Sequence, residues 1–87
     1  MKKAFENYLI DLGYKQFTPR GLPSTVYAYS KSIEQVLAWE NITWQQLAQN
    51  ITIFCNQYDI GGIKEELGKL SHNTVINALR RFREFCH

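Results

Sequence analysis

The fold is decided by one stretch near the end of the chain, Ser71-His72-Asn73-Thr74-Val75-Ile76-Asn77-Ala78-Leu79-Arg80-Arg81-Phe82-Arg83-Glu84-Phe85-Cys86. Apolar residues recur in it every three or four positions, and on a helix of 3.6 residues per turn they form one stripe. The stripe consists of Val75, Ala78, Leu79, Phe82, Phe85 and Cys86. We therefore predict a helix from about His72 to Cys86, with Ser71 as its N-cap and the stripe in the core.

The opposite side of this closing helix is polar. It carries Asn73, Asn77, Arg80, Arg81 and Glu84. Amide and guanidinium groups at helical spacing suit the recognition of a polar polymer. The same pattern is typical of any amphipathic helix that faces water, so this segment by itself leaves both interpretations open.

Length and composition indicate one small globular domain, residues 1–87. A chain of 87 residues has room for a single core and is near the lower size at which a domain folds without disulfides or metals. Its 45% hydrophobic content supports such a core. Because the net charge is only +2, any binding to nucleic acid must come from local placement of Lys and Arg.

The chain shows no targeting signal and no membrane segment. Glu6, Asn7 and Asp11 interrupt the apolar residues near the N-terminus, and no apolar run approaches the roughly 18 residues that a spanning helix needs. We expect a cytoplasmic protein in which Cys55 and Cys86 are reduced. The glycosylation sequons at Asn41 and Asn50 are interpreted as helix starts instead.

The remaining segments also read as helices. Periodic apolar residues, Gly, Pro and capping signals predict a helix from Lys3 to Leu12, an extended loop from Tyr14 to Pro23, a second helix from Ser24 or Thr25 to Glu40, helical structure from Thr43 to Asp59, and a short turn from Ile63 to Leu67 that Gly68 ends. Whether the segment from Thr43 to Asp59 forms one helix or two stays open, because Asn50 could cap a new one. The predicted fold is all-α, a single small bundle of four to five helices.

Two local features refine this prediction. Thr43 and Gln46 fit a capping box, in which each side chain accepts a hydrogen bond from a backbone amide at the start of the helix. Trp39 lies off the centre of the apolar stripe of its helix, so we expect it to pack against a neighbouring element.

No residues combine into a catalytic, cofactor or metal site. The chain has no glycine-rich phosphate loop and no paired CxxC, and its two histidines, His72 and His87, do not form a ligand pair. Cys55 and Cys86 occupy core spacing, which is typical of structural thiols rather than nucleophiles. We therefore expect no enzyme activity, no cofactor and no metal ion.

The order of these signals resembles a known family. The motifs are Phe5, Tyr8 and Leu9 in the leading helix, the segment Ser24–Tyr29 with Thr25 and Tyr29 four residues apart, then Trp44 and Leu47, and the closing pattern Ser71–Phe82. This pattern resembles the N-terminal core-binding domain, also called the SAM-like domain, of tyrosine recombinases and phage integrases. The resemblance covers nearly the whole chain.

The resemblance implies that the bundle holds one side of duplex DNA while a separate catalytic domain closes on the other side. Two helices would lie across the major groove, and the implied DNA-binding residues are Thr25, Lys31, Asn73, Thr74, Asn77, Arg80 and Arg81. Arg80 and Asn77 would contact base edges. Thr25, Lys31, Asn73 and Arg81 would contact phosphates.

One departure from the family is large. The Arg, Lys, His and Tyr that cleave DNA in the family belong to a C-terminal domain of which this chain has no part, so the chain by itself is not expected to cut or join DNA. Both a fragment of a longer integrase and a stand-alone protein are compatible with the sequence, and we expect a monomer in isolation. The alternative interpretation is a helical protein-interaction domain of the SAM or death-fold type, with Trp39, Tyr27 or Phe17 as partner anchors.

Overall fold

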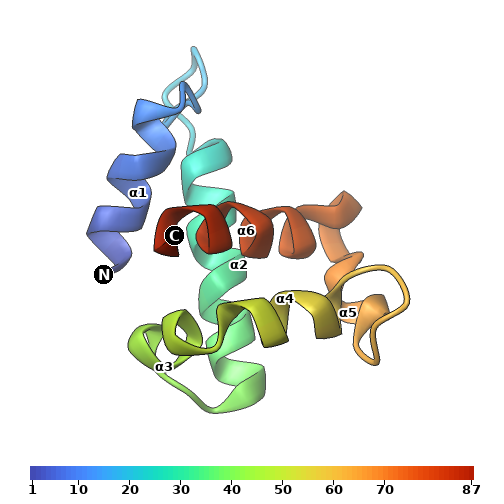
Figure 1. Ribbon diagram of the computed structural model, residues 1–87. Coiled ribbons are helices and arrows are strands. Elements are labelled where there is room, and N and C mark those ends of the chain that lie inside the picture. Colours follow the sequence, from blue (N-terminus) through green and yellow to red (C-terminus); the bar gives the residue numbers. More distant parts are fainter.

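The computed structural model describes residues 1–87 as an all-α bundle (Figure 1). Its helices are α1 (Lys2–Asp11), α2 (Thr25–Glu40), α3 (Trp44–Gln49), α4 (Ile51–Tyr58), α5 (Glu65–Gly68) and α6 (Leu70–Cys86). The predicted fold class is confirmed, and the helix count reaches six because Thr43–Asp59 divides at Asn50 and α5 is a separate single turn. No helix has both the length and the apolar character that a bilayer crossing requires.

α6 is the central helix. It crosses in front of α2 and contacts every other helix of the bundle (Figure 1). The predicted apolar stripe explains this position, since Val75, Ala78, Leu79 and Phe82 are buried while Phe85 and Cys86 are half-buried. Ile76, which lies outside the predicted stripe, is buried as well, because α5 brings Gly68 against it.

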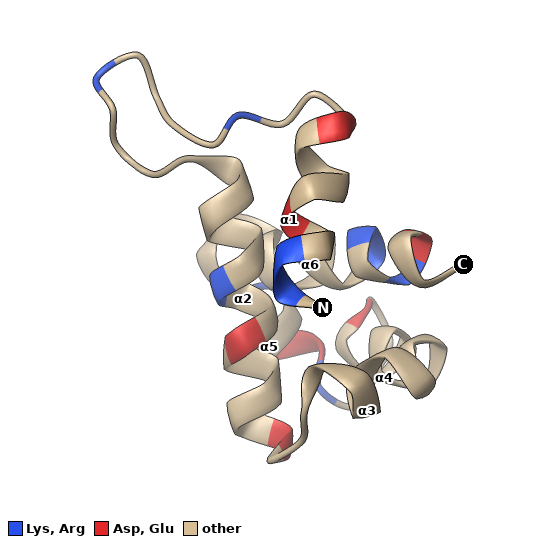
Figure 2. Cartoon of the chain, turned by 90° about the vertical axis from the view of Figure 1, so that its left-hand side faces the viewer, with Lys and Arg blue, Asp and Glu red and all other residues tan.

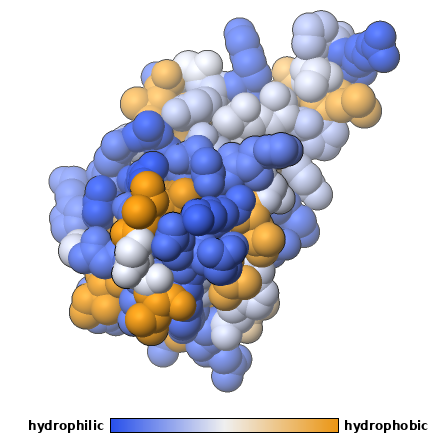
Figure 3. Space-filling model, turned by 90° about the vertical axis from the view of Figure 1, so that its right-hand side faces the viewer, coloured by the Kyte–Doolittle hydropathy of each residue, from blue (hydrophilic) through white to orange (hydrophobic).

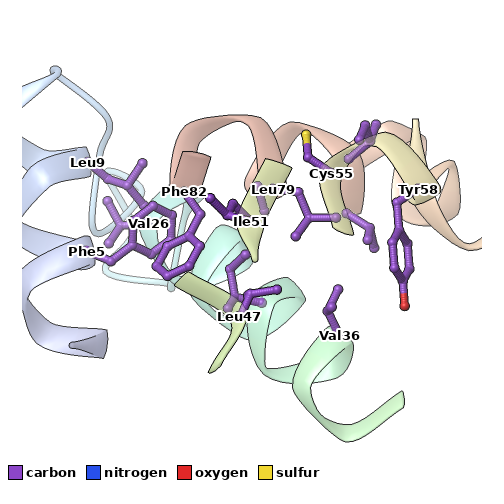
Figure 4. Close-up of a cluster of buried hydrophobic side chains, with 14 residues drawn as sticks. Phe5, Leu9, Val26, Val36, Leu47, Ile51, Cys55, Tyr58, Leu79 and Phe82 are labelled. Carbon is purple, nitrogen blue, oxygen red and sulfur yellow. The ribbon is translucent and has the colours of Figure 1, made fainter. Parts of the chain in front are cut away.

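Aromatic rings fill the end of the core where α1, α3 and α6 meet. The Phe5 ring lies edge-on to Phe82, with 5.2 Å between ring centroids, and Trp44 packs against both. Leu9, Val26, Leu47 and Leu79 continue the core beyond these rings (Figure 4). A buried aromatic cluster of this kind is a large source of stability in so small a domain.

A polar cluster joins the ends of α2 and α4. The Tyr58 hydroxyl donates a 2.7 Å hydrogen bond to Glu40, and Lys64 pairs with the same carboxylate. Burial acts to raise the pKa of Glu40, but the hydrogen bonds from Lys64 and Tyr58 outweigh it and the pKa is lowered. Trp39 stacks on the Tyr58 ring, which confirms that it packs against a neighbouring element.

Local signals in the first part of the chain have mixed outcomes. The capping box of Thr43 and Gln46 is present, with both hydrogen bonds formed. Asn50 separates α3 from α4, yet its side chain donates to the Gln46 carbonyl and does not cap α4. The expectation that Asn41 starts a helix is wrong, because Asn41 ends α2 in the left-handed conformation that Asn tolerates better than most residues.

The predicted start of the closing helix is also wrong. Ser71, His72 and Asn73 have positive φ angles, so the backbone makes a left-handed turn before the regular helix begins at Thr74. Ser71 makes no side-chain cap, since an N-cap needs an extended backbone that this residue does not have. Instead, the Thr74 hydroxyl donates to the Ser71 carbonyl, and the Asn73 amide donates to the Lys69 carbonyl.

Candidate nucleic-acid interface

The polar side of α6 remains accessible after folding. Asn73 and Glu84 are exposed, and Asn77, Arg80 and Arg81 are half-exposed. The Arg80 and Arg81 side chains keep 38% and 35% of their surface accessible. Three of the predicted DNA-binding residues, Asn77, Arg80 and Arg81, therefore lie on the polar side of the regular helix, and Asn73 lies in the left-handed turn just before it.

Arg80 is held by an acidic residue from the end of α4. Its Nη2 atom lies 2.7 Å from Oδ1 of Asp59, and its Nη1 atom donates at 3.4 Å to the Asn77 side chain. The hydrogen bond from Arg80, together with the Ile60 amide, lowers the pKa of the Asp59 carboxyl. These two bonds fix the orientation of the Arg80 guanidinium. Because a guanidinium has five N–H donors, other N–H groups of Arg80 remain available for a ligand.

A hollow of about 220 Å³ lies beside this pair. It is formed by the end of α4, α5 and the first turns of α6, and Asn73, Asn77 and Arg80 all line it. Asp59 and Glu65 also line it, and each is paired with a cation of the same wall, Asp59 with Arg80 and Glu65 with Lys69. The hollow is therefore polar and close to neutral, which suits amide-mediated contacts better than the capture of an isolated anion.

Arg81 is held by Tyr14, which follows α1, and by Glu84 of α6 itself. Its Nε atom donates at 3.1 Å to the Tyr14 hydroxyl and its Nη1 atom to the Glu84 carboxylate. These bonds, the one to Glu84 first, raise the pKa of Arg81 further. The Tyr14 ring in turn lies edge-on to Tyr29 of α2, with 5.5 Å between ring centroids. One Arg81 nitrogen, Nη2, has no partner in the chain and can donate outward.

The residues predicted on α2 and at the start of α6 lie in different surroundings. Thr25 is half-buried at the first position of α2, one helical turn before Tyr29. Thr74 is half-buried, and its hydroxyl donates a hydrogen bond to the Ser71 carbonyl. Lys31 lies on the outer side of α2, opposite the buried residues of that helix, and its ion pair is with Glu34. The structure thus gathers the α6 residues but leaves Lys31 on another face.

Sequence reasoning missed the partners of both arginines. Tyr14 and Asp59 follow helix ends, where no periodicity marks which side chain will turn back towards the core. The one available signal is charge, because Asp59 is the only acidic residue between Glu40 and Glu65. Because Asp59 has no acidic neighbours in the sequence, its pairing with one of the α6 arginines could have been inferred.

Exposed apolar residues lie on the segments that form the hollow, and one of them, Ile60, lines it. Ile60 and Ile63 are almost fully exposed on the loop before α5, and Leu70 is partly exposed at the start of α6. Figure 3 shows this side of the molecule, where hydrophobic side chains stand among hydrophilic ones. No group of three or more His, Cys, Asp or Glu residues is placed to hold a metal ion here or elsewhere in the chain.

A second set of cations lies on the loop between α1 and α2. This loop carries Lys15 and Arg20 and extends past α2 on the side away from the C-terminal end of α6 (Figure 2). Neither residue has an ion pair.

The fold and the arginine-bearing helix define a small helical domain with a polar surface on its central helix. Comparison with protein-family models, with curated proteins and with solved structures found no match to this chain.

Proposed function

We propose that this chain is a duplex-DNA-binding module of a site-specific recombinase of the tyrosine recombinase, or phage integrase, type. The observation that carries the proposal is the polar side of α6, where Asn77, Arg80 and Arg81 of the regular helix and Asn73 of the turn before it stay accessible. The resemblance of the sequence to the core-binding domain of that family supports the same assignment.

The dimensions of α6 suit a DNA groove. Its regular part, from Thr74 to Cys86, is about 20 Å long at 1.5 Å per residue. A helix of this size enters the major groove, where amide and guanidinium side chains read base edges. Asn77 and Arg80 are placed for base edges in this proposal, and Asn73 and Arg81 for phosphates.

The internal partners of the arginines favour binding by a preorganised surface. Asp59 orients Arg80 while Tyr14 and Glu84 orient Arg81, so little side-chain freedom is lost when DNA arrives. The same carboxylates reduce the positive potential of the surface. Affinity should therefore be modest, and if about three phosphates are neutralised, log K should fall against log salt with a slope of about −3.

The remaining parts of the proposal follow from the family resemblance. The module does not cut or join DNA by itself and works beside a catalytic domain that closes on the opposite side of the duplex. Recombination on cellular DNA places the protein in the cytoplasm.

The test is DNA binding by the wild-type chain and by Arg81→Gln and Arg80→Gln variants. Fluorescence anisotropy with a labelled mixed-sequence duplex of about 20 base pairs at low salt should give a Kd of about 10–100 µM. Arg81→Gln should weaken binding severalfold and reduce the salt slope by about one, because Arg81 is placed at a phosphate. Arg80→Gln should weaken binding severalfold and leave the slope nearly unchanged, because Arg80 is placed at base edges.

Arg20→Gln is the matched control. It removes the same group from the loop between α1 and α2, and Arg20 has no ion pair to lose. Thermal unfolding of each variant shows whether the fold is intact. Equal losses from Arg20→Gln and Arg81→Gln, or no binding at millimolar duplex, would contradict the proposal.

One observation favours the alternative of a SAM- or death-fold-like interaction domain. Phe17 and Tyr27 are 59% and 51% exposed, which is unusual for aromatic residues without a partner. Trp39, the third expected anchor, is instead stacked on Tyr58. Sedimentation that depends on protein concentration and does not respond to DNA would favour this function over DNA binding.

A further inference from the structure

A groove of about 350 Å³ lies between α1 and α2, on a part of the surface to which no residue of α6 contributes. Its walls are Lys3 and Glu6 of α1, Val26 and Tyr27 of α2, and Gln16, Phe17 and Pro23 of the connecting segment. That segment, residues 15–24, is called the hairpin loop below.

The hairpin loop is an ordered element. The Gly21 amide donates at 2.8 Å to the Thr18 carbonyl, which closes a turn with Pro19 at its second position and Gly21 at a positive φ of 81°. The Thr18 amide donates to the Leu22 carbonyl, and the Ser24 amide donates to the Gln16 carbonyl. These bonds hold Phe17 opposite Pro23, so the loop presents its side chains without an ordering cost on binding.

Apolar side chains are concentrated on this surface. Phe17, Leu22 and Tyr27 are 59%, 60% and 51% exposed. Phe17 separates the groove from a second hollow, which Lys15, Thr18, Pro19 and Ser24 line. A binding partner can place apolar side chains of its own in both hollows, one on each side of the Phe17 ring.

The hairpin loop and the start of α2 carry charge of one sign, and the one carboxylate in the groove, Glu6, comes from α1. From Leu12 to Ile33 the chain contains no Asp or Glu, whereas Lys15, Arg20 and Lys31 all fall in this range. Lys15 and Arg20 are exposed and have no ion pair. A partner that covers Phe17 therefore meets unneutralised cations at the rim of the contact, which favours acidic residues in that partner.

We propose that the groove and the hairpin loop form a docking surface for an acidic peptide segment of a protein partner, one that inserts a Phe or Leu side chain beside Phe17. The partner's carboxylates pair with Lys15 and Arg20. This surface is separate from α6, so the proposal does not rest on DNA binding and the two ligands can be held together.

A peptide fits this surface better than a nucleic acid does. The groove is walled by Phe17, Pro23, Val26 and Tyr27, which offer apolar contact but few donors for phosphates. Glu6 lies in the same groove and would repel a continuous phosphate backbone. A peptide avoids that repulsion because it can place an apolar side chain next to Glu6 and its carboxylates at the loop.

The test uses three labelled synthetic peptides of about ten residues with the full chain. The first contains Asp and Glu with one Phe and one Leu, the second replaces Phe and Leu by Ala, and the third replaces the acidic residues by Asn and Gln. Only the first should bind measurably in fluorescence anisotropy. In amide NMR spectra it should shift residues of the hairpin loop, the start of α2 and the part of α1 around Lys3 and Glu6, while resonances of α6 stay in place.

Variants then locate the contact. Phe17→Ala should weaken binding of the first peptide about tenfold, as is typical for a central aromatic anchor. Arg20→Gln should weaken it about threefold, as expected for a charge at the rim. Arg83→Gln removes an arginine from α6 and should leave binding unchanged. Because Phe17 and Arg20 are exposed, both variants should keep the wild-type unfolding midpoint.

Three results would overturn the proposal. Equal binding of the Ala peptide would show charge attraction without docking. Shifts confined to residues outside the hairpin loop, α1 and α2 would place the contact elsewhere. Duplex DNA that shifts the hairpin loop while the first peptide does not would assign the surface to nucleic acid.

Discussion

Two surfaces of this molecule carry arginines in opposite ways. On α6, Arg80 bonds to Asp59 and Arg81 to Tyr14, which connects α6 to neighbouring parts of the chain, and Arg81 also pairs with Glu84 within α6. On the hairpin loop, Arg20 is exposed without a partner. Arg80 and Arg81 therefore contribute to stability and are also available for binding, whereas Arg20 is available for binding alone.

This difference between α6 and the hairpin loop shows how contributions to stability and to binding can be measured separately. A substitution on α6 changes both the fold's stability and any DNA contact, so its effect on binding must be read against an unfolding measurement. A substitution on the hairpin loop changes binding without that complication. The predictions below test this contrast, beginning with the largest expected effect.

The largest contrast is between two phenylalanines. Phe82 is fully buried against Phe5 and Trp44, so Phe82→Ala should lower the free energy of unfolding by about 3–5 kcal/mol. Phe17→Ala on the hairpin loop should change it by less than about 0.5 kcal/mol. Urea unfolding followed by circular dichroism measures both, and similar losses from the two variants would show that the hairpin loop belongs to the core.

A second contrast concerns carboxylates and pH. Glu40 accepts hydrogen bonds from Tyr58 and Lys64, and Glu40→Gln should lower the free energy of unfolding at pH 7 by about 2 kcal/mol. The folded pKa of Glu40 is lowered from its ordinary 4.5, so its contribution is present above that pH and is lost as the pH falls through the folded pKa. Wild-type stability should therefore drop below about pH 4.5, and less steeply in the variant.

Glu66→Gln is the control for that experiment. Glu66 is exposed, so its substitution should leave the pH dependence as in the wild type. If Glu66→Gln reduced the loss of stability at acid pH as much as Glu40→Gln does, the polar cluster between α2 and α4 would not be the cause of that loss.

The third prediction compares the arginines directly. Arg80→Gln breaks a half-exposed pair with Asp59 and should lower the free energy of unfolding by about 0.5–1 kcal/mol, while Arg20→Gln should have no measurable effect. Combining Arg80→Gln with Asp59→Asn tests the pair itself, since the double variant should be less unstable than the two single losses added together. Full additivity would mean that the Arg80–Asp59 contact contributes nothing in solution.

The smallest expected effect concerns the left-handed turn before the regular part of α6. His72 has φ of 57°, a conformation that costs a residue with a side chain about 1–2 kcal/mol and costs glycine almost nothing. Glycine also loses more freedom on folding, so His72→Gly should stabilise the fold by only about 0.5 kcal/mol. A clear loss of stability on thermal unfolding would show that residue 72 is not left-handed in solution.

The sequence predicted those parts of the fold that depend on regular apolar spacing or on a capping motif. The stripe from Val75 to Phe82 predicted the central helix, and the pair Thr43 and Gln46 predicted the start of α3. In both cases the deciding contacts lie within one helix or on one face of it, so spacing along the chain is sufficient.

The start of the closing helix could not be read in the same way. A Ser before an apolar run is a common N-cap, but here α5 ends at Gly68, where an added Cβ would lie 2.0 Å from the Tyr58 carbonyl oxygen. That close approach of two backbones sets the path of the chain into α6. It depends on tertiary packing that no local pattern encodes.

The candidate interface was predictable only in part. The polar side of α6 follows from its helical spacing, and Asn77, Arg80 and Arg81 share it, whereas Asn73 lies in the left-handed turn that the spacing did not predict. Lys31 was assigned to the same interface by resemblance, yet its helix turns it to another face. The partners Tyr14 and Asp59 come from loops, whose direction is set by packing.

The most direct test of the central claim is a map of amide chemical-shift changes as a mixed-sequence duplex is added to the wild-type chain. DNA binding through α6 predicts that the largest changes fall between Asn73 and Glu84, with further changes at Tyr14 and Asp59, and that they diminish as salt is raised. Changes confined to the hairpin loop or to α3, or none at millimolar duplex, would contradict it.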